Sequence, residues 1–380
     1  MKKLALIIFF DVFILMLLGL VIVMSASSTY SVVKFDSVFA LFNSHLFKVL
    51  LAFVCMIVFC FVPYEIYRSL SKPAIVFMAI ILLLTLFIAP DIKGAGRWLD
   101  LGFTSIQPAD IAKLVLIIHL AFLLNDKSNL IENYRHGFIY LFIWVMIISV
   151  LIMLQPNISN GIMLILVSLT IMYVGGARLK HIFISLVPFV LVGGLAVLLH
   201  SHSRARIFSF IESVFHGGDI NLQVKQSLYS LGSGGIVGVG AGNSMQNNLF
   251  LPEAYGDFIF AILGEEMGFI GTMIVLSGFL VFFFTGILIA KKSKDKFGQL
   301  LAFGITLSIT AYAFVNVAVT TGLLPTTGLP LPFISFGGTS LLFLGISVGI
   351  LINVALSNVI IQETGTVIMQ KEQFPGMIKV

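Results

Sequence analysis

A group of four carboxylates lies in the one long polar stretch of an otherwise apolar chain. The stretch covers residues 223–271, and its acidic residues are Glu253, Asp257, Glu265 and Glu266. A carboxylate beside a bilayer is poorly solvated, so such residues are usually kept for chemistry or for ion handling. The group therefore predicts a general base or an ion pathway. The structural alternative for Asp257 is an ordinary helix N-cap, a position that Asp favours.

A run of small residues from Gly232 to Gly242 precedes these acids. Glycine lets the backbone adopt positive φ or approach a ligand closely. We expect this run to be flexible, so that the loop can open for a bulky substrate.

The composition places the chain in a membrane. Of its 380 residues 59% are hydrophobic and only 10% are charged, and the mean hydropathy is +1.09. A soluble globular protein would have an apolar share of about 45–50%. We therefore expect an all-α polytopic membrane protein. Cys55 and Cys60 share one apolar span, which argues against a disulfide framework or a zinc site, and the net charge of +5 does not indicate a nucleic-acid partner.

Ten apolar segments are long enough to be transmembrane helices. They are 4–25, 45–63, 73–90, 108–125, 136–154, 159–176, 182–199, 257–290, 299–323 and 337–358. The segment 257–290 is too long for one straight crossing, because a helix rises ~1.5 Å per residue and the hydrocarbon core is ~30 Å thick. We expect its first part, with Asp257, to lie outside the core, and Gly268 and Gly271 to be break points.

The distribution of basic residues predicts that both termini are cytoplasmic, because Lys and Arg concentrate on the cytoplasmic side. This orientation places inside Lys2, Lys3, Arg68, Lys72, Lys127, Arg135, Arg178, Lys180, Lys291, Lys292, Lys294 and Lys296. Three polar loops then lie outside: 91–107, 324–336 and the large extracytoplasmic loop 200–256 between helices 7 and 8. The proline-rich segment 321–340 is predicted to be a rigid outer loop or a re-entrant segment. Residues 1–360 form one transmembrane domain, and 361–380 a short cytoplasmic tail.

Some basic residues nevertheless fall in the outer loops, where this rule disfavours them. They are Lys93, Arg97, Arg204, Arg206 and Lys225. Arg and Lys are the natural partners of phosphate oxygens, so these residues indicate an anionic ligand at the outer leaflet. The alternative is that each is an isolated, solvated loop charge.

Several long motifs, in order along nearly the whole chain, resemble one family. They are GAGRW, QPADIAK, QSLYSLGSGG, GAGNS, FLPEAYGDFIFAILGEE and TGLLPTTGLPLPFISFGGTS. The chain is similar to the SEDS proteins (shape, elongation, division and sporulation), which include bacterial RodA, FtsW and SpoVE, and its GNS motif is closest to FtsW. The resemblance implies a peptidoglycan glycosyltransferase that polymerises lipid II at the outer face of the cytoplasmic membrane, for cell division or cell shape.

The resemblance also implies site residues. The family's essential aspartate falls on Asp257, and its conserved arginine and lysine fall on Arg97 and Lys113. The full set of expected substrate-binding residues is Arg97, Lys113, Arg204, Arg206, Gln226 and Glu253.

The chain departs from the family pattern in three places. Asp110 stands where the family has Glu, Asn157 stands where it has Asp, and Tyr255 with Gly256 replaces a His-Thr pair. The shorter acid loses reach, and the neutral Asn157 puts any metal or proton role there in doubt. None of the departures changes Asp257.

Joining two lipid-linked disaccharides requires one base and cations that stabilise a pyrophosphate leaving group. Asp257 is the expected base for the acceptor hydroxyl. Arg97, Lys113, Arg204 and Arg206 are the expected pyrophosphate ligands. No protein metal site is assigned, although a divalent cation (Mg²⁺ or Mn²⁺) is left open.

Expected partners are lipid II, membrane lipid, a class B penicillin-binding protein and other division or elongation proteins. The competing interpretation is a transporter that flips the lipid-linked precursor, with Asp110, Lys113, Glu265 and Glu266 in its pathway. It is disfavoured because no internal repeat is visible and the functional-looking residues gather on one face. A scaffold protein would leave the outer basic residues and Asp257 unexplained.

Overall fold

The structure is a computed structural model, and it describes residues 1–89, 96–100, 105–127, 130–199, 201–215, 218, 220–246, 251–252 and 254–373. The helices are α1 Lys2–Phe35, α2 Ala40–Phe61, α3 Glu65–Ile88, α4 Pro108–Asp126, α5 Ile139–Leu154, α6 Ile158–Val174, α7 Leu179–Leu199, α8 Ser201–Phe215, α9 Leu222–Ser233, α10 Ile259–Lys292, α11 Lys296–Thr320 and α12 Thr339–Gln373. A π-helical turn, Tyr134–Phe138, leads into α5. The strands β1 (Leu99–Asp100) and β2 (Ser105–Ile106) form a small antiparallel pair.

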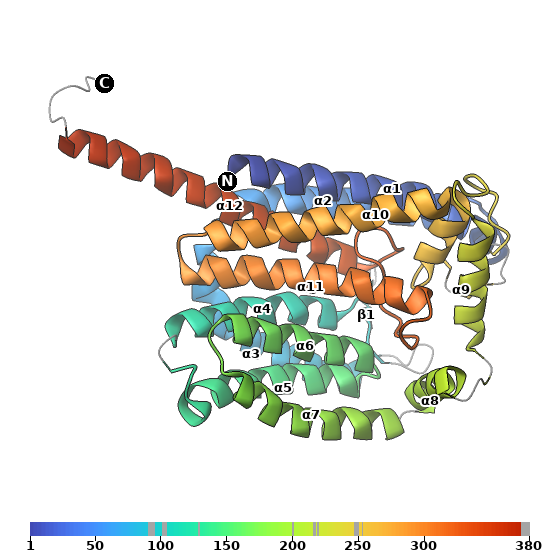
Figure 1. Cartoon of the computed structure of the whole chain (residues 1–380), viewed down its shortest axis with the longest axis horizontal. Helices are drawn as coiled ribbons and strands as arrows, with labels where there is room; N and C mark the ends of the chain where they lie inside the picture. Colours follow the sequence, from blue (N-terminus) through green and yellow to red (C-terminus); the bar gives the residue numbers. More distant parts are fainter. Residues whose placement is uncertain are drawn as a thin grey trace.

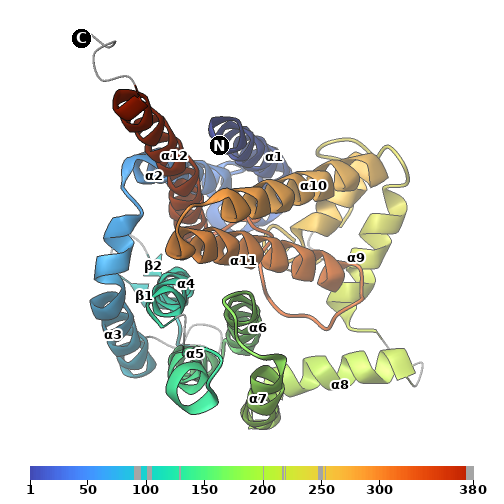
Figure 2. The ribbon, with the colours of Figure 1, turned by 60° about the vertical axis from the view of Figure 1, so that its left-hand side comes forward.

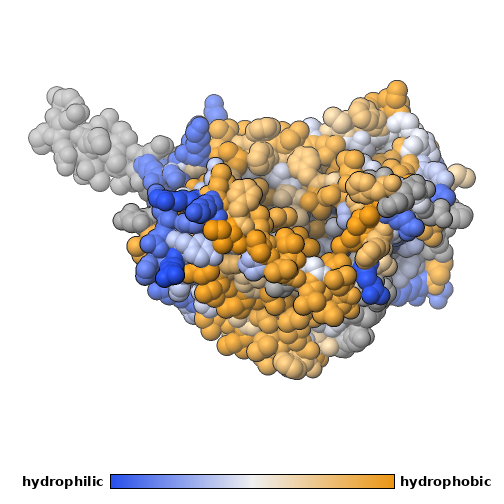
Figure 3. All heavy atoms as spheres, turned by 60° about the horizontal axis from the view of Figure 1, so that its bottom comes forward, coloured by the Kyte–Doolittle hydropathy of each residue, from blue (hydrophilic) through white to orange (hydrophobic). Residues whose placement is uncertain are grey.

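The described part of the chain contains 9 helices that are long and apolar enough to cross a membrane. Helix α6 has 17 residues and packs between α5 and α11, and we count it as the tenth. Large apolar side chains remain exposed on the outside of the bundle, as they must where lipid is the solvent. Figure 3 shows a broad hydrophobic surface with hydrophilic residues gathered towards its two ends. The predicted all-α polytopic fold is confirmed.

The long helices lie side by side, and two shorter helices cross one end of the bundle. The first residues of α1 and the end of α12 lie at the same end (Figure 1). At the opposite end α8 and α9 run across the long helices, and the two views agree on this (Figure 2). Both belong to the predicted outer loop 200–256. The buried residues of α9 are Val224, Ser227 and Ser230, spaced three apart along one helical face.

The predicted boundaries of several helices were wrong. Helix α3 begins at Glu65 rather than at 73, and Pro73 lies inside it. Residues 65–72 are helical, but they are mostly polar, so hydropathy alone places the start of the helix too late. Helix α12 continues to Gln373, so the first part of the predicted tail, which begins at 361, is helical.

The proline-rich loop after α11 enters the bundle. Leu329, Leu331, Phe333 and Ile334 are almost completely buried. Gly19 of α1 allows this approach, because a Cβ there would lie 2.6 Å from the carbonyl oxygen of Phe333. The loop therefore packs inside the bundle, as the re-entrant alternative predicts, and we call residues 321–340 the re-entrant loop.

Helix α10 is broken at Gly268, where φ is 65° and ψ is −165°. This break was predicted, whereas Gly271 lies in regular helix, so that second break point was wrong. The break frees main-chain groups on both sides of Gly268, and those groups need partners because Gly268 is buried in the protein.

The glycine-rich run supplies these partners. Phe269 and Ile270 donate their N–H groups to the carbonyls of Gly235 and Ile236, at 2.9 and 3.1 Å. In the other direction, the N–H groups of two residues of the run bond to carbonyls of α10. These bonds are Val239 N to Glu265 O at 2.9 Å and Gly240 N to Glu266 O at 3.0 Å.

The run is also packed closely against α10. A Cβ on Gly238 would lie 2.2 Å from the carbonyl oxygen of Glu266. The expectation of a flexible, opening loop is therefore wrong for residues 235–240: they are glycine-rich because they pack directly on the backbone of α10, and we call them the α10 clamp.

Candidate functional site

Asp257 lies two residues before the first residue of α10, and its backbone is held from two sides. The side-chain amide of Asn316 on α11 donates to its carbonyl oxygen at 2.7 Å. The two preceding residues bond to the re-entrant loop: Ser335 Oγ donates to Gly256 O at 2.8 Å, and Phe336 N donates to Tyr255 O at 2.9 Å. The N-cap of α10 is Phe258, without a side-chain capping bond, so Asp257 does not have the N-cap role.

Gly328 brings Asp257 and Arg206 together. Its φ is 72°, a conformation that favours glycine. A Cβ at this position would lie 3.3 Å from Oδ2 of Asp257 and 3.7 Å from Nη1 of Arg206. Gly328 therefore lies against both side chains, so the carboxylate that precedes α10 and the guanidinium from α8 face the same residue of the re-entrant loop.

A polar face of α11 joins this centre to Lys113. Tyr312, Asn316 and Thr320 recur every four residues and so lie on one face of the helix. The ammonium nitrogen of Lys113 lies 4.7 Å from the centre of the Tyr312 ring. Asn316, one turn further along, holds Asp257. Lys113 and Asp257 are therefore positioned by neighbouring turns of the same helix.

Lys113 also forms an ion pair with Asp110 on the same turn of α4. Their side chains meet at 2.8 Å, and Asp110 is almost completely buried. Thr339 at the start of α12 donates to the other oxygen of Asp110 at 3.3 Å. The aspartate that replaces the family's glutamate thus has the reach to neutralise Lys113 locally.

The second departure from the family pattern joins the same network. The side-chain oxygen of Asn157 accepts a hydrogen bond from the side-chain nitrogen of Asn160 at 2.8 Å. The side-chain oxygen of Asn160 accepts one from the Tyr312 hydroxyl at 2.9 Å. Asn157 therefore holds Asn160, which in turn accepts a hydrogen bond from the hydroxyl of the tyrosine whose ring faces Lys113.

The other predicted site residues are placed less closely. Arg97 is half-buried beside β1, and its neighbour Trp98 packs on Gly338, where a Cβ would lie 3.2 Å from the indole ring. Arg204 is exposed on α8 and, being two residues from Arg206, points to a different face of that helix. Gln226 is half-buried on α9.

Glu253 lies outside the described residues. Of the predicted set, Arg206 lies against the same glycine as Asp257, and Lys113 is connected to Asp257 through α11.

Glu265 and Glu266, the other two acids, hold the architecture around the broken helix. Glu265 accepts hydrogen bonds from Ser230 of α9 at 2.9 Å, from Ser244 at 2.6 Å and from the main chain of Met245 at 3.0 Å. Glu266 accepts one from the hydroxyl of Ser25 on α1. These carboxylates fix α9, α1 and the loop after the α10 clamp to α10.

Sequence reasoning missed Tyr312, Asn316 and Gly328. A signal for the first two was present, because polar residues spaced four apart in an apolar helix mark one polar face. Gly328 carried no distinct signal, since its importance comes from two side chains that are distant in the sequence.

Within the described ranges, no three His, Cys, Asp or Glu side chains come close enough together to hold a metal ion. A divalent cation at this site would have to share Asp257 with oxygens of a substrate. Such shared coordination is common for Mg²⁺, which is usually held by one or two carboxylates together with substrate phosphates.

The fold and site define a polytopic helical membrane protein with an acidic residue and basic residues gathered at one end of its bundle. The chain belongs to the FtsW, RodA and SpoVE family: the sequence profile of that family, described as "Cell cycle protein", matches residues 5–359. The predicted family is confirmed.

Two curated relatives illustrate the similarity. The probable peptidoglycan glycosyltransferase FtsW of Geobacter sp. (strain M18) is 36% identical over 349 residues, which cover 90% of this chain and 94% of the relative. The stage V sporulation protein E of Bacillus subtilis (strain 168) is 36% identical over 345 residues, with coverages of 90% and 94%.

Solved structures share the fold. A chain of a peptidoglycan synthase complex that coordinates polymerization and crosslinking matches with a TM-score of 0.74 and 21% identity, covering 92% of this chain and 97% of that one. The rod shape determining protein RodA of Thermus thermophilus matches with a TM-score of 0.67 and 21% identity, with coverages of 92% and 96%.

Proposed function

We propose that this protein is a peptidoglycan glycosyltransferase that polymerises lipid II at the outer face of the cytoplasmic membrane, with Asp257 as the general base. The observation that carries the proposal is that Asp257 and Arg206 both lie against Gly328. Membership in a family whose relatives bear this activity in their names supports it.

The reaction forms one bond and breaks one. An acceptor sugar hydroxyl attacks the anomeric carbon of the donor, and the bond from that carbon to the lipid pyrophosphate breaks. Asp257 takes the hydroxyl proton, and the pyrophosphate leaves with the bonding electrons. Because the pyrophosphate is already a good leaving group, the paired acid and base of a glycoside hydrolase are not required.

Arg206 is suited to the leaving group. Its planar guanidinium presents donors that match phosphate oxygens, and it lies against the same glycine as the proposed base. Preorganised positive charge beside the developing charge is the largest contribution that such a site can make.

Lys113 is proposed as a second pyrophosphate ligand. An ammonium has three N–H donors, and Asp110 uses at least one of them, so the group can bind a phosphate oxygen while it remains paired. Arg97 and Arg204 remain proposed contacts at the rim of the site. No step is assigned to a divalent cation.

The orientation in the membrane follows from charge. Twelve Lys and Arg residues on the predicted cytoplasmic side include the cluster Lys291–Lys296, which connects α10 and α11. With that end inside, Asp257 faces outward, and both termini are cytoplasmic. A class B penicillin-binding protein is the proposed partner, because a solved structure with this fold is part of a complex that couples polymerization to crosslinking.

The transporter alternative has one observation in its favour, the buried pair of Asp110 and Lys113. The pair lies in the first turns of α4, next to the start of α12, and not in the middle of a pathway. It is also already neutralised.

The deciding experiment uses the purified full-length protein and lipid II without any other glycosyltransferase. We expect glycan polymer from the wild type and none from Asp257→Asn. Movement of lipid II from one leaflet of a vesicle membrane to the other, with no polymer formed, would instead support the transporter interpretation.

A further inference from the structure

A groove lies between α8, α9 and residues 321–326. Arg206 and Asn221 contribute hydrogen-bond donors to its walls. Arg206 connects the groove to the proposed reaction centre, because its guanidinium also lies near Gly328, against which Asp257 lies.

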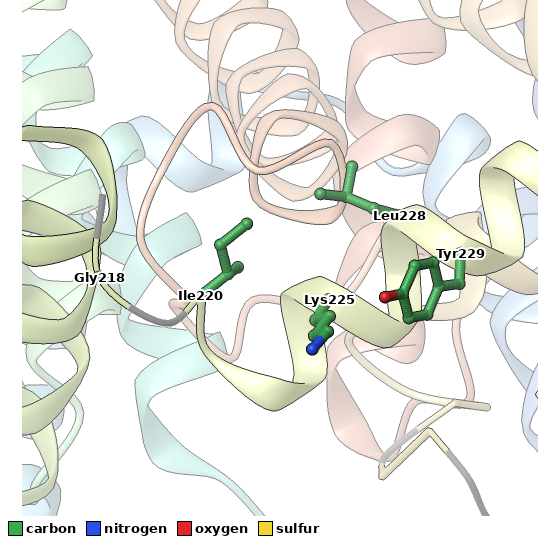
Figure 4. Close-up of a pocket in the computed structure, with 5 residues that line it drawn as sticks. All are labelled: Gly218, Ile220, Lys225, Leu228 and Tyr229. Atoms are coloured by element: carbon green, nitrogen blue, oxygen red, sulfur yellow. The ribbon is translucent and has the colours of Figure 1, made fainter.

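A second groove continues from the first along the outer side of α9. Gly218, Lys225 and Tyr229 line it, as Figure 4 shows. Ile220 and Leu228 line both grooves, so the two form one connected surface. Asn221 and Tyr229 are eight positions apart, which corresponds to about 12 Å along a helix.

The first groove is rich in hydrogen-bond donors. The side-chain oxygen of Asn221 caps α9 by accepting a hydrogen bond from Gln223 N at 2.9 Å. The side-chain nitrogen of Asn221 is therefore the part that can donate to a ligand. The hydroxyl of Thr326 has no hydrogen-bond partner among the described residues, and the side chain is only 7% exposed. The hydroxyl oxygen itself is closed off from the groove, so the donors that a ligand can reach are the Asn221 amide and the guanidinium of Arg206.

The second groove adds an aromatic face. Tyr229 is 56% exposed, and Lys225 lies one helical turn before it on the same side of α9 (Figure 4). A sugar ring has an apolar C–H face and a polar edge. A tyrosine ring beside an ammonium group fits both, because the ring offers a rigid apolar surface and the ammonium offers donors.

We propose that the two grooves form one track that binds the saccharide part of the substrate and leads it away from Asp257. The inference rests on the proposed function, because it takes a glycan to be what the site makes. Two sources have the same chemistry: the sugars of the incoming acceptor, and the glycan strand already made.

A binding experiment tests the track without turnover. Chitotetraose, a tetramer of N-acetylglucosamine, is titrated into the full-length Asp257→Asn protein and into the same protein with Tyr229→Ala or Lys225→Gln added. Each addition should lower the affinity about two- to tenfold, the loss expected for one aromatic or hydrogen-bonding contact. Tyr173→Ala, which removes a tyrosine that is 48% exposed on α6, should leave the affinity unchanged.

A polymerisation assay then shows whether the track binds the acceptor sugars or the growing glycan strand. A raised KM for lipid II with unchanged chain length in the Tyr229→Ala and Lys225→Gln proteins would assign the track to the acceptor. Shorter chains at unchanged KM would assign it to the growing strand.

The proposal is contradicted if chitotetraose does not bind to the Asp257→Asn protein. It is also contradicted if chitotetraose binds with the same affinity when Tyr229→Ala or Lys225→Gln is added. A wild type that binds chitotetraose but makes no polymer would count against the proposed function and leave the track in place as a saccharide site.

Discussion

Asn316 holds Asp257 by its main chain and leaves the carboxylate to other contacts. One amide donates at 2.7 Å both to the carbonyl of Asp257 and to that of Leu329 in the re-entrant loop. A single side chain on α11 therefore fixes the proposed base relative to the loop that lies against it. The distance between Asp257 and the re-entrant loop depends on Asn316, because neither segment forms a regular helix at the contact.

Replacing Asp257 by Asn should abolish polymerisation, because the amide is nearly isosteric but cannot accept the hydroxyl proton. Expression and thermal stability should stay close to wild type. Asp126→Asn, at the far end of α4, is the matched control. Near-normal polymer yield from the Asp257→Asn protein would end the assignment of Asp257 as base.

Asn316→Leu should reduce both the rate and the stability. The change leaves two carbonyl groups without a donor in a buried place, at a cost of about 1–3 kcal/mol. The measurements are kcat at saturating lipid II and the thermal unfolding midpoint. An unchanged kcat would show that Asn316 does not position the base.

Gly328→Ala should lower the activity strongly. The new methyl group would meet Asp257 and Arg206, and the residue would also be held at positive φ. Gly235→Ala separates the two effects, because Gly235 has φ 54° but no neighbouring atoms within 4 Å of the added Cβ. If both variants lose activity to the same degree, backbone strain accounts for the loss and crowding of the site does not.

Tyr312→Leu should weaken the use of lipid II more than Tyr312→Phe does. The phenylalanine keeps the ring that faces Lys113, a contact worth about 0.5–2 kcal/mol, and loses only the bond to Asn160. KM for lipid II is the quantity to compare. Equal effects of the two changes would indicate that the hydroxyl, and not the ring, is what the site uses.

The orientation can be tested with single cysteines after Cys55 and Cys60 have been replaced. A cysteine at Asn243, which is exposed near the α10 clamp, should react in intact cells with a thiol reagent that does not cross membranes. A cysteine at Lys292, exposed at the other end of α10, should react only after the membrane is opened. The reverse pattern would place Asp257 inside, where it could not act on an outer-leaflet substrate.

The sequence by itself determined the class, the number of spans and the candidate base. Hydropathy is a local property, and a helix in lipid must satisfy its own backbone, so length and composition suffice to find the spans. The break at Gly268 was predicted for the same reason, since the segment 257–290 exceeds one membrane thickness.

The tertiary structure decided what the polar residues do. Arg204 and Arg206 look equivalent in the sequence and both are exposed, yet Arg206 lies near Gly328 and lines the groove beside the re-entrant loop, because the two residues point to different faces of α8. The glycine run looked like a flexible loop and is a packed clamp, since its partners are main-chain groups of a distant broken helix. Contacts between segments far apart in the chain leave no local pattern, so their consequences appear only in the folded molecule.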